Sequence, residues 1–241
     1  FTFRGGIISG ADLGYQGNIC YHISAGTIHG GIEYIGGEYY IFYHRCTNNT
    51  DFSRQACAER IRIDEDGSIR QVEVTTQGVE REPLVARRLW QAAECCNLYN
   101  QKTTRVMGNG HNRDVPTIVS ENGISYITAI NDGTVIGYKY LCFAGISGIR
   151  LRYRGGGGEL LIATDEKTLA AACSGKIENV LQKNAEHGAS EYGIVCRIAL
   201  KSDDEWTWAE AACSIAGARL PLYLIYRGKG KIDLLDFEFY E

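Results

Sequence analysis

The stretch Thr27–Arg45 reads TIHGGIEYIGGEYYIFYHR and decides the class of fold. Apolar and aromatic residues alternate with other residues on both sides of Gly36 and Gly37. Two such runs around a Gly-Gly pair are typical of a β-hairpin, because glycine readily adopts the positive φ angles of a two-residue hairpin turn. The sequence therefore predicts a β-hairpin here, with His29 just before its first strand.

The rest of the chain repeats this β pattern. The 241 residues include 29 glycines, and turn residues separate many short apolar runs. Only Glu166–Cys173 has a pattern that fits a helical turn or two, and it fits a strand and loop equally well. Apolar residues make up 44% of the chain, enough for a substantial core. We predict an all-β protein.

Charge and hydropathy exclude several classes of function. The net charge is −4, and acidic and basic residues are interspersed, so the sequence has no basic stripe for nucleic acid and no polybasic tail. No apolar run approaches the roughly twenty residues that span a bilayer. We therefore expect no nucleic-acid partner and no membrane partner.

The cysteines favour a reduced environment. There are nine, so at least one is unpaired, and most lie in apolar runs where a thiol packs as a small apolar side chain. No CxxC pair or zinc-type spacing is present. We expect a cytoplasmic (bacterial) rather than a secreted protein. Because Phe1 starts inside a strand-like run, we also expect a longer protein of which this chain is a part.

A charged segment, Gly78–Arg88, contains Pro83 and predicts a linker between two domains. The first domain, residues 1–86, has several strand candidates, including Ser68–Val74. The DEDG string at Asp64–Gly67 predicts a tight turn before that strand, since an EF-type calcium loop spreads its ligands over about twelve residues. The second domain, residues 87–241, has the many short strands of a β-sandwich.

Residues 1–80 resemble the end of the five-bladed β-propeller of glycoside hydrolase family 43. The matching strings are FTFRGGIISG (1–10), the hairpin of residues 27–45, and TDFSRQACAERIRIDEDGSIRQVEVTTQGV (50–79). In that family they correspond to the strand before the last blade, the last blade's histidine and hairpin, and the closing segment. The three occur here in the same order.

Residues 87–241 resemble a family 6 carbohydrate-binding module. NDGTVIGYKYLCF (131–143) is similar to one of its strands, and WTWAEAACSIAGARLPLYLIYRGKGKIDLLDFEF (206–239) is similar to its closing motif. A propeller followed by such a sandwich is a common family 43 arrangement. The resemblance implies the last blade of a β-propeller plus a jelly-roll β-sandwich.

The resemblance also implies an activity for the parent enzyme, the inverting hydrolysis of arabinofuranosyl or xylosyl linkages in plant cell-wall oligosaccharides. Inverting enzymes use two carboxyl groups roughly 6.5–9.5 Å apart. In family 43 these lie in earlier blades, so no catalytic carboxylate maps onto this chain, and Glu33, Glu38 and Glu59 occupy positions without such a role. We expect the chain to be inactive alone and to need the missing N-terminal blades as its partner.

Two residues of the first domain match ligand-facing positions of the family. His29 matches the last-blade histidine that binds a calcium ion or its water shell beneath the active site, next to the substrate. Arg54 matches an arginine that faces the substrate in some relatives, where a guanidinium can bind sugar hydroxyls. The alternatives are a His29 that bonds to backbone and a loop Arg54 that pairs with Asp51 or Glu59.

In the second domain the resemblance assigns Asp236 to a structural calcium site, with Glu94 as its partner. Calcium is therefore the expected cofactor. The family's sugar cleft has an aromatic residue and an asparagine where this chain has Val135 and Leu234. These replacements imply a module that has lost most of its sugar binding and braces the propeller.

Two other functions stay open. A non-catalytic carbohydrate-binding protein would need an exposed aromatic pair. Trp206 and Trp208 alternate on one predicted strand and so share a face, but we expect one or both of them in the core. A structural or interaction module would instead use unpaired strand edges to bind a partner.

Overall fold

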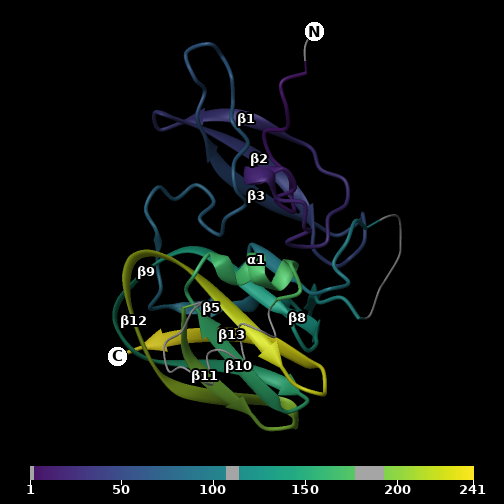
Figure 1. Cartoon of the computed structure of the whole chain (residues 1–241), viewed down its shortest axis with the longest axis vertical. Coiled ribbons are helices and arrows are strands. Elements are labelled where there is room, and N and C mark those ends of the chain that lie inside the picture. The colour runs from purple at the N-terminus through teal and green to yellow at the C-terminus, as the bar shows by residue number, and fades with distance from the viewer. Residues whose placement is uncertain (1–2, 107–113, 177–192) are drawn as a thin grey trace.

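The computed structural model describes residues 3–106, 114–176 and 193–241. These residues form a three-stranded and a ten-stranded β-sheet, with one short α-helix, α1 (Lys167–Cys173), and two 3-10 turns, η1 (Tyr15–Gly17) and η2 (Ala92–Glu94). The predicted all-β class is confirmed. Figure 1 shows the two sheets at opposite ends of the molecule, with α1 on the side of the larger sheet that faces the smaller one. No helix in the described ranges is long and apolar enough to cross a membrane.

The three-stranded sheet contains the predicted hairpin. Its strands β1 (Gly30–Ile35), β2 (Glu38–Cys46) and β3 (Arg54–Ile61) are antiparallel and lie in that order. The turn between β1 and β2 is Gly36–Gly37, whose φ angles are +59° and +89°. Both angles lie in the left-handed region that glycine adopts without steric cost, so the Gly-Gly pair determines where the hairpin turns.

The segment after β3 differs from the prediction. The turn at Asp64–Gly67 forms, and the Gly67 N–H donates to the Asp64 carbonyl at 2.9 Å. However, Ser68–Val74 is not a strand and makes only one isolated bridge. Its backbone bonds to the N-terminal segment instead: the Val74 N–H donates to Oδ1 of Asp12 at 2.7 Å. The carboxylate of Asp12 thus takes the place of a backbone carbonyl that a neighbouring strand would have offered to Val74.

The ten-stranded sheet curls into a β-sandwich. Its strands are β4 (Leu84–Val85), β5 (Leu89–Gln91), β6 (Asn97–Tyr99), β7 (Thr117–Glu121), β8 (Ile124–Ile130), β9 (Val135–Gly155), β10 (Gly158–Ala163), β11 (Ile194–Leu200), β12 (Asp203–Arg227) and β13 (Ile232–Tyr240). The long strands β9 and β12 pair with each other, and register shifts between Ala212 and Leu222 bend the ribbon. One half of β9 pairs with β6 and the other half with β13, so the ribbon contributes to both layers.

The sandwich core is aromatic and closed to solvent. Trp90, Tyr138 and Phe237 are each 0% exposed, and the Phe237 ring lies 5.0 Å from Tyr138 and 6.1 Å from Trp90, centroid to centroid. Strand β4 pairs with β9, although it precedes the domain boundary predicted after Ala86. The boundary itself stays a prediction.

Side chains and one disulfide connect the two sheets. Arg45, on β2, is buried and donates to the carbonyl of Cys96 at 3.2 Å and to that of Cys95. Cys20, in the N-terminal segment, forms a disulfide with Cys173 at the end of α1. The sequence did not indicate this pair, because the two residues are separated by 153 positions and no local spacing relates them.

Candidate functional site

His29 lies just before β1 and is exposed. Its ring meets the ring of His44 edge-on, with centroids 4.4 Å apart. His44 lies on β2 and is buried, and its Nε2 has no hydrogen-bond partner among the described residues. The structure thus places two imidazoles together at one end of the small sheet. A role of His29 in binding substrate or calcium stays a prediction.

Arg54 begins β3 at the same end of this sheet, on the opposite side of β2 from His29. Its side chain is exposed, and Nε donates to the backbone carbonyl of Asp51 at 3.3 Å. This contact fits the interpretation as a loop arginine near Asp51. A cavity of about 210 Å³ beside this end of β2 is lined by His44, among others.

Glu59 is the one buried carboxylic acid of the three glutamates considered above. Its oxygens accept hydrogen bonds from the Thr75 N–H at 2.7 Å, the Thr75 hydroxyl at 2.6 Å and the Tyr43 hydroxyl at 3.3 Å. Burial raises the pKa of Glu59 to about 8 in spite of these donors. Its partners are all structural, so the geometry gives it no substrate-facing role.

The predicted calcium ligands Asp236 and Glu94 each bind an arginine. Asp236 is buried on β13 and accepts from Nε of Arg152 at 3.2 Å and from a second guanidinium nitrogen. Glu94 accepts from Arg88 and, at 3.0 Å, from the Gln91 N–H. Within the described ranges, no three His, Cys, Asp or Glu side chains converge as a metal site would require. This donor set fits calcium poorly, and calcium binding stays a prediction.

Val135 and Leu234, which the resemblance places at the sugar-binding positions of the carbohydrate-binding module, are both 0% exposed. Val135 packs in a cluster with Leu169 of α1 and with Tyr223 of β12. Both positions therefore serve packing, and neither side chain is available to a ligand.

The structure corrects the expectation that one or both tryptophans of β12 lie in the core. Trp208 is 47% exposed, and Trp206 is half-buried. The guanidinium carbons of Arg150 and Arg152, on β9, lie 5.0 and 5.3 Å from the Trp208 ring. That of Arg154 lies 4.5 Å from the Trp206 ring. We call these five residues the arginine–tryptophan face.

Carboxylates of β13 hold these arginines in place. Arg154 pairs with Asp233 at 2.9 Å, and Arg150 pairs with Glu238. Fixed guanidinium groups next to an exposed indole can stack with, and donate hydrogen bonds to, a flat polar ligand such as a sugar ring. Sequence reasoning missed this face, although the alternation in RLRYR (150–154) and WTW (206–208) signals it, since alternate strand residues share one side.

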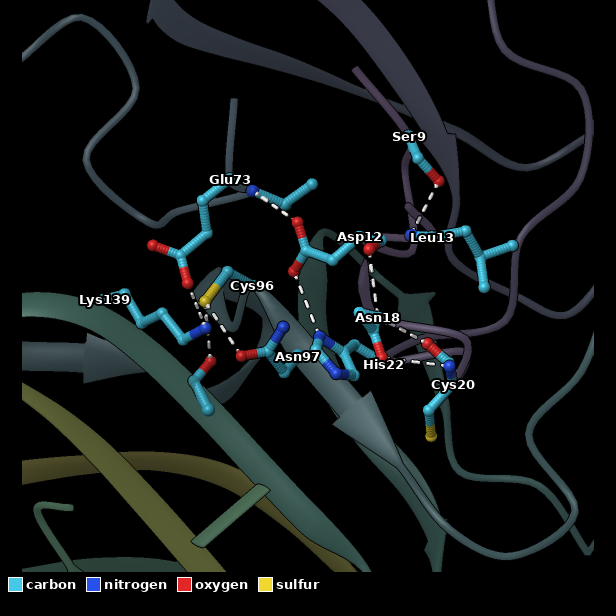
Figure 2. A network of polar contacts seen from close by, with 12 residues as sticks. Ser9, Asp12, Leu13, Asn18, Cys20, His22, Glu73, Cys96, Asn97 and Lys139 are labelled. Atoms are coloured by element: carbon cyan, nitrogen blue, oxygen red, sulfur yellow. Dashed lines mark hydrogen bonds and ion pairs between the residues drawn. The ribbon is translucent and has the colours of Figure 1, made fainter. Parts of the chain in front are cut away.

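A second feature missed from the sequence lies where the two sheets meet. Glu73 follows the small sheet and Lys139 lies on β9; Nζ of Lys139 is 2.7 Å from Oε1 of Glu73. Figure 2 shows these side chains pointing toward each other, beside Asp12 and His22, whose carboxylate and imidazole are 3.2 Å apart. The Lys139 side chain is only 5% exposed. Burial favours a neutral amine, but the acidic groups around it, Tyr223 and Glu73 among them, raise the pKa of Lys139, so the amine keeps its charge.

This ion pair borders a cavity of about 580 Å³, which we call the junction cavity. Its walls come from the N-terminal segment, from β9 and β12, and from α1 with the residue before it. The polar and aromatic side chains that line it include Asn18, His22, Glu73, Lys139, Glu166 and Tyr223. Cys20 and Cys173 also line it, so the disulfide connects two of its walls.

Comparison with known proteins identifies relatives of this chain. No protein-family model matches it. It is 33% identical over 248 aligned residues to a xylosidase/arabinosidase of Thermoclostridium stercorarium, an alignment that covers 98% of this chain and 48% of the relative. The chain thus spans about half the length of this curated relative.

One solved structure shares the fold along the whole chain, and a second aligns with part of it. A family 43 arabinoxylan arabinofuranohydrolase of Bacillus subtilis, solved with cellotetraose, aligns with all of this chain and 45% of its own, at a TM-score of 0.53 and 15% identity. A family 6 carbohydrate-binding module of Clostridium cellulolyticum, solved with xylose, aligns with 65% of this chain at a TM-score of 0.46 and 15% identity. The predicted resemblance is confirmed: in sequence the chain is similar to a xylosidase/arabinosidase, and in fold it is similar to a family 43 arabinofuranohydrolase.

Proposed function

We propose that this chain, a relative of family 43 glycoside hydrolases, is one part of a glycosidase that acts on arabinofuranosyl or xylosyl linkages of plant cell-wall oligosaccharides. The observation that carries the proposal is the 33% identity along 98% of the chain to a xylosidase/arabinosidase. The parent enzyme would hydrolyse these linkages with inversion, using carboxyl groups that this chain does not supply.

The exposed edge of the small sheet supports this proposal. All six residues of β1 are exposed, and β1 is the outermost strand of its sheet. Its apolar side chains include Ile32, Tyr34 and Ile35, which are 39%, 61% and 47% exposed. An edge strand with apolar side chains favours pairing or packing with further protein. The missing blades of a propeller are the partner we propose for it.

The first test is hydrolysis of 4-nitrophenyl α-L-arabinofuranoside and 4-nitrophenyl β-D-xyloside by the purified chain. We expect no release above the buffer control. The chain is then fused, in the order of the relative, to the part of the Thermoclostridium stercorarium protein that it does not cover. In this fusion we expect hydrolysis to appear.

Two matched variants make the fusion test specific. Ile35→Lys places a charge on β1, and Ile124→Lys places one at a similarly exposed isoleucine of β8, in the sandwich. We expect Ile35→Lys to lower the activity of the fusion at least about tenfold and Ile124→Lys to leave it unchanged. Turnover by the unfused chain that follows the protein through purification would contradict the proposal. Catalytic carboxylates would then have to be sought among Glu33, Glu38, Glu59 and Asp64.

A second candidate function is carbohydrate binding without catalysis, and the arginine–tryptophan face favours it. Of the aromatic pair that this function needs, Trp208 is exposed and Trp206 is half-buried. We expect xylo-oligosaccharides to quench the tryptophan fluorescence and Trp208→Ala to weaken binding about tenfold or more. Tyr34→Ala, at an exposed aromatic residue of the other sheet, is the matched control. Equal binding by both variants would exclude the face as the site.

A further inference from the structure

The junction cavity is lined by apolar surface and by several polar side chains, Glu73 and Glu166 among them. The single hydroxyl oxygen of Tyr140 lies 2.8 Å from Oε2 of Glu73 and 3.2 Å from Oε1 of Glu166. Burial and then the charge of Glu73 raise the pKa of Tyr140, so the hydroxyl keeps its proton. One proton cannot serve two carboxylates at once. Glu166 is exposed, so its carboxylate can accept a hydrogen bond from a ligand hydroxyl in place of water.

The charges around the cavity are balanced. Glu73 and Glu166 are matched by Lys139 and Lys167, all four of which line it. A ligand with a net charge would bring an unpaired charge into the cavity, which costs free energy, whereas a neutral ligand would leave the two acids and two lysines balanced. The aromatic rings of Tyr15 and Tyr223 also line the cavity and offer apolar surface.

The size of the cavity suits a small molecule. Its volume of about 580 Å³ lies within the range of roughly 300–1,000 Å³ that is usual for ligand sites. Its walls come from both halves of the chain, since Glu73 follows the small sheet while Glu166 precedes α1. A bound molecule would therefore contact both halves at once.

We propose that the junction cavity binds a neutral, hydroxyl-rich molecule of mono- or disaccharide size, whose hydroxyls donate to Glu166 and Glu73. This site is separate from the arginine–tryptophan face and does not depend on the glycosidase proposal. Because the ligand contacts both halves of the chain, its binding stabilises their junction.

Binding is measured by saturation-transfer NMR and by the rise in Tm with xylobiose as the probe. All measurements use the full chain with Trp208→Ala, which removes the exposed indole of the other face. We expect transfer to xylobiose and a rise in Tm that grows with its concentration. Glucose, glucosamine and glucuronate then compare neutral, cationic and anionic forms of one ring. Glucose is expected to bind best.

Two variants locate the site. Ala170→Trp places a large ring at an exposed alanine of α1 that lines the cavity, and Ala216→Trp is the matched change at an exposed alanine of β12 outside it. We expect Ala170→Trp to abolish binding and Ala216→Trp to leave it unchanged. Glu166→Gln, which keeps the shape of the side chain, should weaken binding about tenfold.

The proposal is overturned if xylobiose does not bind the Trp208→Ala chain, if Ala170→Trp and Ala216→Trp bind equally well, or if either charged sugar binds more tightly than glucose. Loss of hydrolysis in the fusion described above would leave these outcomes unchanged. The two proposals therefore fail separately.

Discussion

The three-stranded sheet and the β-sandwich bury their strands to very different extents. Every residue of β1 is exposed, whereas β13, at the centre of the sandwich, has Leu234 and Phe237 at 0% exposure. The small sheet is buried mainly on β2 and around Glu59, where it meets the rest of the chain. The sandwich therefore has a core of its own, while the small sheet depends on its neighbours.

The contacts between the two regions include an apolar cluster of Tyr43, Val74 and Cys96 as well as polar contacts. Arg45 bonds to carbonyls of the sandwich, Glu73 pairs with Lys139, and the Cys20–Cys173 disulfide adds a covalent link. Polar contacts specify geometry but contribute modestly to net stability, because each group gives up water to form them. The β-sandwich therefore supplies most of the stability of the chain, while the three-stranded sheet exposes all of β1 to solvent.

The strongest test of this comparison is a pair of aromatic truncations. Phe237→Ala opens a cavity in the sandwich core beside Trp90 and Tyr138 and should cost about 3–5 kcal/mol of unfolding free energy. Tyr34→Ala, on the exposed β1, should change it by less than about 0.5 kcal/mol. Urea unfolding of both variants measures the difference. Similar losses in the two variants would show that β1 is part of a core.

The second test removes the covalent link. Cys20→Ser should destabilise the chain by about 2–4 kcal/mol, because the disulfide closes a loop of 153 residues in the unfolded state. The variant is compared with the parent in the absence and in the presence of a reductant. The reductant should destabilise the parent and leave Cys20→Ser unchanged. A reductant effect of equal size in both proteins would mean that another cysteine pair is responsible.

The third test uses the buried carboxyl of the small sheet. Since the folded pKa of Glu59 is about 8 and the unfolded value is about 4.3, the folded state binds a proton that the unfolded state has lost between these pH values. Stability from this group is fully present below pH 4.3 and is lost as the pH rises to 8. Glu59→Gln, which stays neutral, should flatten this decline and be more stable than the parent above pH 8, on the order of 2 kcal/mol.

Unfolding free energies of the parent and of Glu59→Gln from pH 5 to pH 9 measure this effect. Glu33→Gln, at an exposed glutamate of β1, is the matched control and should follow the parent. A parent and a Glu59→Gln variant that decline equally with pH would mean that another group causes the decline.

Local sequence signals predicted the fold better than they predicted the site. Gly36–Gly37 and its flanking alternation defined the hairpin, because a turn and its strands are encoded by adjacent residues. The junction cavity depends on Glu73 and Lys139, which are 66 positions apart, and no local pattern indicates such a pair. The strand expected at Ser68–Val74 failed for the same reason, since Asp12, far away in sequence, takes one of its backbone donors.

The resemblance to known families predicted the relatives of this chain, but it did not predict which neighbours individual side chains contact. Asp236 matches a calcium position, yet Arg152 on the neighbouring strand neutralises it. One or both of Trp206 and Trp208 were expected in the core, yet Trp208 is exposed and has Arg150 and Arg152 beside its ring. Both outcomes depend on cross-strand neighbours, which are known only once the strand register is known.

The smallest expected effect concerns calcium and the sandwich. A site with a Kd of about 0.1 mM would add about 1.4 kcal/mol of stability in 1 mM calcium. Because Asp236 and Glu94 each bind an arginine, we expect chelator-treated protein to gain less than about 0.5 kcal/mol on addition of calcium. Thermal unfolding with and without calcium measures this. The expectation is contradicted if calcium adds about 1 kcal/mol or more to the unfolding free energy, and if Asp236→Asn removes this gain while His29→Ala does not. Calcium would then bind Asp236 in the sandwich, in the place that Arg152 now occupies.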